Sequence, residues 1–195
     1  DVDGSNAGST ITLAVNDGCT ADANYDALSD QTVAAALTDD DTAGFTKSTS
    51  SVTVTEASGG SHTATFTVVL DSEPTGNVVI DVTSGTTGQA TVSPSSLTFT
   101  VGNWDSTQTV TVTGVDNDVD GSNAGSTITL AVNDGSTADG NYDALSDQTV
   151  AAALTDNDTA GFTVIESSGS TSVNESGTTD TFTVVLNTQP SGNVV

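Results

Sequence analysis

The sequence predicts an all-β fold made of tandem β-sandwich modules, and three observations support this prediction. Residues 1–46 return almost letter for letter as residues 118–163, an offset of 118 − 1 = 117 residues, so the repeat is about one domain long. Within the repeat, apolar residues alternate with Thr or Ser in short runs, which is typical of half-buried strands. Clusters of Gly, Asn, Asp, Ser and Pro separate these runs and predict turns.

The repeat also predicts how the chain is divided. Its two copies differ only in the pairs Cys19/Ser136, Ala23/Gly140 and Asp40/Asn157, and FTVVL at residues 66–70 recurs at 182–186. We expect a window from a longer tandem array: residues 1–41 as the C-terminal part of one module, residues 42–158 as a complete module, and residues 159–195 as the N-terminal part of the next. The junctions TDDDTAGF and TDNDTAGF are short, so they constrain the orientation of neighbouring modules more than a Gly/Ser linker would.

Strands are expected in chain order wherever the alternation is clear. The runs are TATFTVVL (63–70), NVVIDV (77–82), SLTFTV (96–101), QTVTVTG (108–114), TITLAVN (127–133) and TVAAALT (149–155). The residues expected to face the core are Phe66, Val68, Leu70, Val78, Ile80, Val82, Leu97, Phe99, Val101, Val110, Val112, Ile128, Leu130, Val132, Val150, Ala152 and Leu154. About seven such strands per repeat fit an antiparallel, immunoglobulin-like Greek-key sandwich. NYDALSDQ (141–148) predicts one short turn of helix.

The charge of the chain excludes several classes of partner. One Lys or Arg stands against 26 Asp and Glu, which gives a formal net charge of −25. Nucleic acids and anionic membrane surfaces need a basic face, so we expect neither as a partner. We also expect no direct membrane insertion, because no apolar run is long enough to span a bilayer. Self-repulsion at this charge destabilises a compact chain unless cations neutralise it.

Two acidic motifs predict calcium as that cation. Asp116, Asp118 and Asp120 alternate along the chain before Gly121, as in the first half of a calcium-binding loop. The twelfth position is Thr127 where an EF-hand has Glu, so the other ligands must come from elsewhere in the fold. The second motif is Asp156-Asn157-Asp158. Earlier copies of the two motifs supply the further candidate ligands Asp1, Asp3, Asp39, Asp40 and Asp41.

The order of these motifs resembles the Calx-beta module. The matching segments are Val54-Thr55-Glu56, Phe66 to Leu70, Asp116 to Asp120, and Asp156 to Asp158. The resemblance implies an immunoglobulin-like sandwich that binds Ca²⁺ at one end, next to the neighbouring domain, in tandem arrays of large bacterial surface proteins and adhesins. The ligands that it implies are Glu56, Asp116, Asp118, Asp120, Asp156 and Asp158, and Glu175 is the counterpart of Glu56 in the third copy.

No residue pattern predicts an enzyme. His62 is the only histidine and has no counterpart in the other copies, and no nucleophile–base pair stands out. Trp104 is expected to cap the sandwich; the alternative is a platform for a sugar. We therefore expect a calcium-stiffened spacer of an extracellular or bacterial cell-surface protein, whose partners are neighbouring repeats. Two alternatives stay open: an adhesive module that contacts a glycan, ice or another cell, and a subunit of a self-assembling extracellular filament that binds copies of itself.

Overall fold

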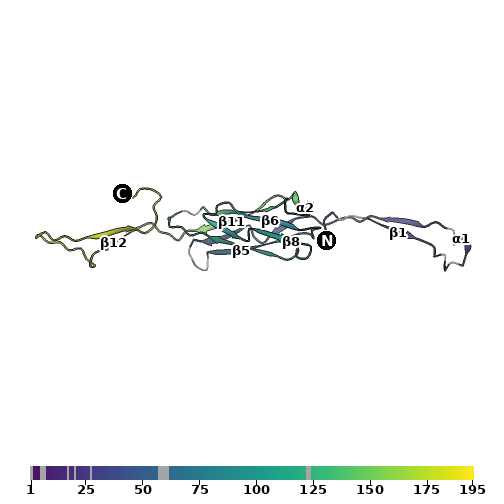
Figure 1. Ribbon diagram of the computed structural model, residues 1–195, viewed down its shortest axis with the longest axis horizontal. Coiled ribbons are helices and arrows are strands. Elements are labelled where there is room, and N and C mark those ends of the chain that lie inside the picture. Colours follow the sequence, from purple (N-terminus) through teal and green to yellow (C-terminus); the bar gives the residue numbers. More distant parts are fainter. Residues whose placement is uncertain are drawn as a thin grey trace.

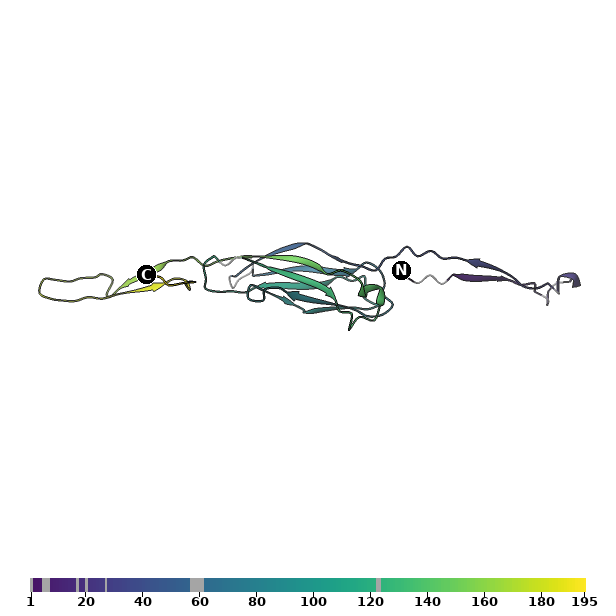
Figure 2. The same ribbon diagram turned by 90° about the horizontal axis from the view of Figure 1, so that it is seen from above.

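The computed structural model describes residues 2–4, 8–16, 18–19, 21–26, 28–56, 62–121 and 124–195. It is an elongated molecule with a β-sandwich in the middle and one β-hairpin projecting from each end (Figures 1 and 2). The two helices among the described residues have four residues each, and neither is long or apolar enough to cross a membrane.

The central sandwich has two sheets. The five-stranded sheet has the order β4 (Ser51–Thr55), β11 (Gln148–Thr155), β10 (Ser126–Val132), β6 (Val78–Ser84) and β8 (Ser96–Phe99). The four-stranded sheet has the order β3 (Phe45–Lys47), β5 (Thr63–Leu70), β9 (Gln108–Gly114) and β7 (Ala90–Ser93). The predicted all-β sandwich is therefore confirmed.

One pair of strands departs from the predicted antiparallel pattern. β4 pairs with β11 in parallel, with Thr55 opposite Thr155, while the other pairs in the two sheets are antiparallel. The cause lies at the start of the module, where β3 belongs to the four-stranded sheet and β4 to the five-stranded one. The chain bends between them and crosses from one sheet to the other. This crossing brings the end of β4 beside the end of β11.

The alternation of apolar residues predicts the core well. Among the described residues, the buried hydrophobic side chains are Ala43, Phe45, Val52, Val54, Phe66, Val68, Leu70, Val78, Ile80, Val82, Ala90, Leu97, Phe99, Val110, Val112, Ile128, Leu130, Tyr142, Val150, Ala152 and Leu154. Trp104 is partly buried and packs against this core, as expected. Val101 was expected inside but is 51% exposed, because β8 ends at Phe99 and Val101 lies in the following turn. Val132, at the end of β10, is only half-buried.

The two projecting hairpins repeat pairings of the central sandwich. The first hairpin joins β1 (Ser9–Leu13) to β2 (Gln31–Ala35) and has α1 (Ala23–Asp26) near its tip. Its pairing of Ser9 with Ala35 recurs 117 residues later as Ser126 with Ala152, and α2 (Gly140–Asp143) follows in the same place. The second hairpin, β12 (Phe162–Glu166) with β13 (Phe182–Leu186), repeats the pairing of β3 with β5.

A candidate metal centre at a module junction

Glu56 is held at one end of the sandwich by the parallel pair of strands. It follows β4 directly, and its backbone N–H donates to the carbonyl oxygen of Thr155, the last residue of β11, at 3.1 Å. Its side chain is 1% exposed. A buried carboxylate is costly unless hydrogen-bonded or paired with a cation, so the surroundings of this group decide what it can do.

Three carboxylates meet at this point. Glu56, Asp156 and Asp158 each offer an oxygen atom that lies within 4.8 Å of the others. The amide Nδ2 of Asn117 donates to Glu56 Oε1 at 2.5 Å. The other oxygen, Glu56 Oε2, and Asp158 Oδ2 are buried without a hydrogen-bond partner. Two unpartnered carboxylate oxygens in one cluster match the chemistry of a hard-cation site.

The electrostatics of the cluster reflect this crowding. Burial raises the pKa of Glu56, and the nearby negative charges of Asp156, Asp158 and Asp116 raise it further. Burial and neighbouring carboxylates, first Asp156 and then Asp118, raise the pKa of Asp158. Asp156 differs, because hydrogen bonds from the backbone N–H groups of Gly121 and Asp158 hold its pKa below the usual value. Each raised pKa means that the folded chain disfavours a charge that a bound cation would stabilise.

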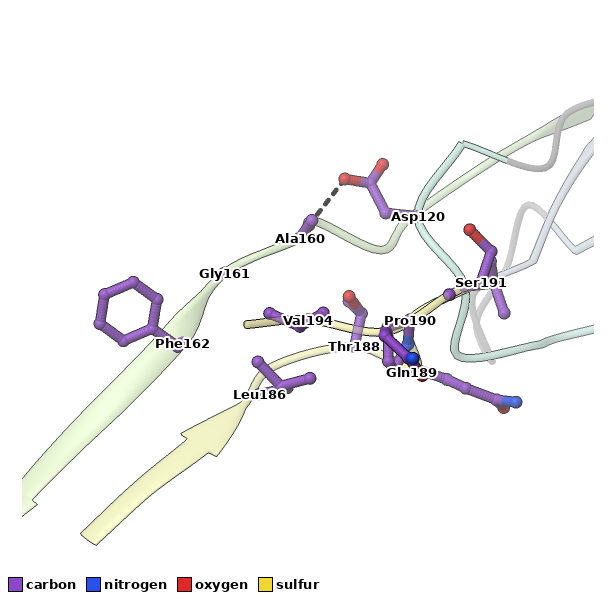
Figure 3. A pocket seen from close by; sticks show the side chains of 13 residues that line it. Asp120, Ala160, Gly161, Phe162, Leu186, Thr188, Gln189, Pro190, Ser191 and Val194 are labelled. Atoms are coloured by element: carbon purple, nitrogen blue, oxygen red, sulfur yellow. Dashed lines mark hydrogen bonds between the residues drawn. The ribbon is translucent and has the colours of Figure 1, made fainter.

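The DxDxDG loop lies next to the cluster but divides its residues between two roles. Asp116 and Asp118 are exposed, and their charges contribute to the raised pKa of Asp158. The charge of Asp120 contributes to that shift as well, and its carboxylate also accepts a hydrogen bond from the backbone N–H of Ala160 at 2.7 Å (Figure 3). The prediction that all three loop carboxylates bind the metal stays a prediction. Asn117 was missed, and the only sequence signal for it is an amide within an acidic loop.

The other predicted ligands lie elsewhere. Asp3, Asp39, Asp40 and Asp41 lie at the junction between the first hairpin and the sandwich, 117 residues before their counterparts. Asp1 lies outside the described residues. Glu175 is exposed in the segment between β12 and β13, apart from the cluster of three carboxylates.

The two junctions use the same hydrogen bonds from backbone to carboxylate. Ala43 N–H donates to Asp3 at 2.9 Å, as Ala160 N–H does to Asp120. Gly4 N–H donates to Asp39 at 2.6 Å, as Gly121 N–H does to Asp156 at 2.5 Å. These two bonds of the second junction thus have counterparts 117 residues earlier.

The first strand after each junction is tied down in the same way. Asp71 N–H donates to the carbonyl oxygen of Gly44, and Asn187 N–H donates to that of Gly161, both at 2.9 Å. The hydroxyl groups of Thr46 and Thr163 then donate to the side chains of Asp71 and Asn187, both at 2.8 Å. The two hairpins therefore leave the sandwich through junctions of one design.

Comparison with known proteins places the chain in no family. No protein-family model matches it, and no curated protein matches it. The resemblance to the Calx-beta module therefore stays a prediction.

The solved structures that are similar to the chain include the following three. Domains 4 and 5 of the S-layer protein SbsC are 23% identical over 65% of this chain and 52% of that one, with a TM-score of 0.40. SbsC domains 4–9 are 20% identical over 72% and 18%, with a TM-score of 0.41. The E. coli chaperone DraB is 8% identical over 62% and 58%, with a TM-score of 0.42. The chain thus covers less than two thirds of each of these structures, and TM-scores below 0.5 support no functional conclusion.

Proposed function

We propose that this chain is a spacer segment of an extracellular or bacterial cell-surface protein, in which calcium stiffens the junctions between tandem modules. The observation that supports this most directly is the recurrence of one set of hydrogen bonds at both junctions, from Ala43 N–H to Asp3 and from Ala160 N–H to Asp120. Modules joined repeatedly by one geometry form a regular rod, because every junction then sets the same angle.

Calcium is the cation that the cluster fits best. Its donors are the carboxylate oxygens of Glu56, Asp156 and Asp158, and donors of this kind favour a hard cation over a transition metal. Ca²⁺ accepts six to eight oxygen ligands in flexible geometry, whereas Mg²⁺ requires a near-ideal octahedron. Glu56 and Asp158 each present one unpartnered oxygen, and the negative charge of Asp118 acts on Asp158.

A cation in this cluster would act on the junction as well as on the sandwich. Asp158 stands two residues before Ala160, whose N–H is bound by Asp120. On the same loop, the carbonyl oxygen of Asp118 accepts a hydrogen bond from Gln189 N–H at 2.7 Å, and Gln189 belongs to the segment after β13. A cation between Glu56 and Asp158 would therefore fix the strand that leaves the sandwich together with the loop that holds the next module.

The proposed location follows from the affinity expected of such a site. Calcium sites of extracellular modules bind with Kd of about 10⁻⁴ to 10⁻³ M, and such sites fill only where calcium reaches this concentration. The net charge of −25 points the same way, because abundant cations are needed to offset self-repulsion.

Small-angle scattering of this chain and of proteins with two and three further repeats tests the proposal. Each is measured with calcium, with chelator, and with sodium at the same ionic strength. We expect the maximum dimension with calcium to grow nearly in proportion to the number of repeats. With chelator, the maximum dimension should shrink and the distribution of interatomic distances should broaden. A dimension that is equal in all three buffers would contradict the role of calcium. One that does not grow with repeat number would contradict the spacer and favour an adhesive module.

A further inference from the structure

A short loop lies against the end of the sandwich from which the first hairpin projects. It consists of residues 2–4, the counterparts of residues 119–121, and is called loop 2–4 below. It contacts two parts of the sandwich, the turn that follows β5 and the short helix α2. Both parts lie at the end of the sandwich nearest the first hairpin (Figure 1).

The contact with the turn after β5 is made by the backbone. Val2 forms a parallel β-bridge with Glu73. A backbone contact between the counterpart segments recurs later in the chain, where Gln189 N–H donates to the carbonyl oxygen of Asp118 at 2.7 Å. Gln189 is the counterpart of Glu73, 116 positions later. Because backbone atoms make this contact, both glutamate and glutamine can occupy the position.

The contact with α2 is made by a side chain. Asn141 Nδ2 donates a hydrogen bond to the carbonyl oxygen of Asp3 at 2.9 Å, although the two residues are 138 positions apart in the chain. The Asn141 side chain is exposed, so this bond contributes to the placement of loop 2–4 more than to the core of the sandwich.

The turn that carries Asn141 is held in place by buried neighbours. Asp139 is 4% exposed and caps α2 by accepting from Asn141 N–H at 3.0 Å. Asp139 also accepts from Thr75 N–H at 2.7 Å. Next to Asn141, the Tyr142 side chain is 0% exposed, and its hydroxyl donates to the carbonyl oxygen of Ser72 at 2.6 Å. The Nδ2 donor is therefore presented by a fixed backbone.

Gly4 fits this contact closely. Its φ of +81° favours glycine, and a Cβ atom built on it would lie 3.2 Å from Asn141 Nδ2. On its other side the loop is bound to residues 39–43, because Gly4 N–H donates to Asp39 at 2.6 Å and Ala43 N–H donates to Asp3 at 2.9 Å. Loop 2–4 thus joins the end of the first hairpin to the surface of the sandwich.

We infer that Glu73 and α2 form a docking surface for the loop of the preceding module, and that Asn141 is the residue that positions this loop and so sets the angle between modules. The docking rests on the proposed function, because it takes residues 2–4 as part of a preceding module. It needs no cation, since amide and backbone N–H groups donate and carbonyl oxygens accept. Each junction then has two restraints, calcium on the carboxylates and the docking surface on the backbone of the loop.

Two substitutions of Asn141 remove the donor in different ways. Asn141→Ala removes the side chain, whereas Asn141→Asp keeps its shape and places a negative charge beside the carbonyl oxygen of Asp3. An aspartate is compatible with the first turn of a helix, so α2 itself should stay folded. Asn77→Ala is the matched control, because Asn77 is an exposed amide in the turn that follows Glu73.

Pulsed electron paramagnetic resonance in the presence of chelator tests the docking. Spin labels on the native Cys19 in the first hairpin and on Ser106→Cys in the sandwich report the distance across the first junction. We expect Asn141→Ala to lower the ratio of docked to undocked molecules roughly fivefold, the worth of one hydrogen bond, and so to broaden the distribution of distances. Asn141→Asp should broaden it further, and Asn77→Ala should leave it unchanged. The melting temperature should be the same in all variants.

A double-mutant cycle tests the pairing of Asn141 with the loop. Gly4→Ala should broaden the distribution by itself, because its Cβ crowds Asn141 Nδ2. In the Asn141→Ala background the same change should add little, since the crowded group is gone. Effects that add in full would mean that the two residues act separately and would overturn the inference.

Two further outcomes would overturn it: an unchanged distribution in Asn141→Ala, or equal broadening in Asn77→Ala. Calcium binding is measured separately, by the melting temperature with calcium and with chelator. A loss of the Asn141 effect with the calcium response intact would count against the docking alone. A chain without a calcium response in which Asn141→Ala still broadens the distribution would count against the proposed role of calcium alone.

Discussion

Asn117 donates a 2.5 Å hydrogen bond from Nδ2 to Oε1 of Glu56 and leaves Oε2 of the same carboxylate buried without a partner. One half of this carboxylate is thus fixed by the loop, and the other half belongs to the cluster with Asp156 and Asp158. The hydrogen bond orients the group, and burial together with the surrounding negative charge raises its pKa in the absence of a cation.

Replacing this carboxylate separates the two effects. Glu56→Gln keeps the shape and an acceptor for Asn117 but removes one buried charge, so the calcium-free protein should gain about 1 kcal/mol of unfolding free energy at pH 7. The same variant should lose most of the stabilisation by calcium, which is about 2.7 kcal/mol at a hundredfold excess over Kd. Thermal melting with calcium and with chelator measures both changes.

Glu175→Gln is the matched control for this prediction. Glu175 is the exposed counterpart in the third copy, and its replacement should change neither melting temperature. A Glu56→Gln protein that keeps the full response to calcium would show that Glu56 is not a ligand.

The sequence predicted the core because alternation needs only local information. Phe66, Val68 and Leu70 point inward because a strand turns every second side chain to the same face. The prediction that Val101 faces the core is wrong because the strand ends before this residue. Asn103 Oδ1 accepts from Thr100 N–H at 2.6 Å, and this turn takes the backbone out of the sheet. Competition between a side-chain bond and a sheet bond cannot be read from apolar spacing.

The sequence predicts which types of residue form the candidate site, but it does not predict which role each residue takes. Glu56 and Asp156 could be paired in advance only through the family resemblance, because their contact depends on the parallel pairing of β4 with β11. The bond between Asn117 and Glu56 and the use of Asp120 at the junction depend on side-chain direction, which a motif does not specify. The sequence did not predict the burial of Tyr142 for a similar reason, because its hydrogen-bond partner Ser72 lies 70 residues away in the chain.

Tyr142 and Tyr25 are the same residue of the repeat in two environments, so one substitution can be compared in both. Tyr142→Phe removes a buried hydroxyl that is bonded to the backbone and side chain of Ser72, and should cost about 1–2 kcal/mol of unfolding free energy. Tyr25→Phe should cost almost nothing, because Tyr25 is 55% exposed. Urea denaturation of both variants measures the two changes in unfolding free energy. Equal losses of unfolding free energy would contradict a stabilising role for the buried hydroxyl of Tyr142.

Alkaline pH should destabilise the protein through the same residue. Burial raises the pKa of Tyr142 above its ordinary value of 10.0, while its hydrogen bonds to Ser72 offset part of the shift. The unfolded chain therefore loses this proton first, so the stabilisation is complete below pH 10 and is lost as the pH rises through the folded pKa. Urea denaturation between pH 9 and about pH 11 should show the loss, and Tyr142→Phe should show a flatter profile. Parallel profiles for the two proteins would contradict the assignment.

The DxDxDG loop should contribute to calcium binding more than an isolated acid does. Asp118 helps to raise the pKa of Asp158, whereas Asp105 lies in a turn, bonded only weakly to the neighbouring Ser106 at 3.4 Å. We expect Asp118→Ala to weaken calcium binding several-fold in isothermal titration calorimetry and Asp105→Ala to leave it unchanged. Similar losses would mean that calcium responds only to the total charge.

The two junctions allow the stiffening itself to be tested within one molecule. They share their hydrogen bonds, but among the described residues the cluster of three carboxylates, Glu56, Asp156 and Asp158, lies at the second junction. Calcium should therefore order the second junction more strongly. The native Cys19 is exposed near the tip of the first hairpin, and with Ser106→Cys it gives a spin-label pair across the first junction. Thr87→Cys with Ser176→Cys, in a Cys19→Ser background, gives a pair across the second.

Pulsed electron paramagnetic resonance reports the distribution of distances for each pair. With calcium the distribution across the second junction should narrow clearly, and Glu56→Gln should abolish the narrowing. The distribution across the first junction should change less, because among the described residues no group of three carboxylates converges there. Equal narrowing at both junctions would show that calcium acts by screening charge alone. If neither distribution changes, these junctions owe their geometry to the hydrogen bonds and not to a metal.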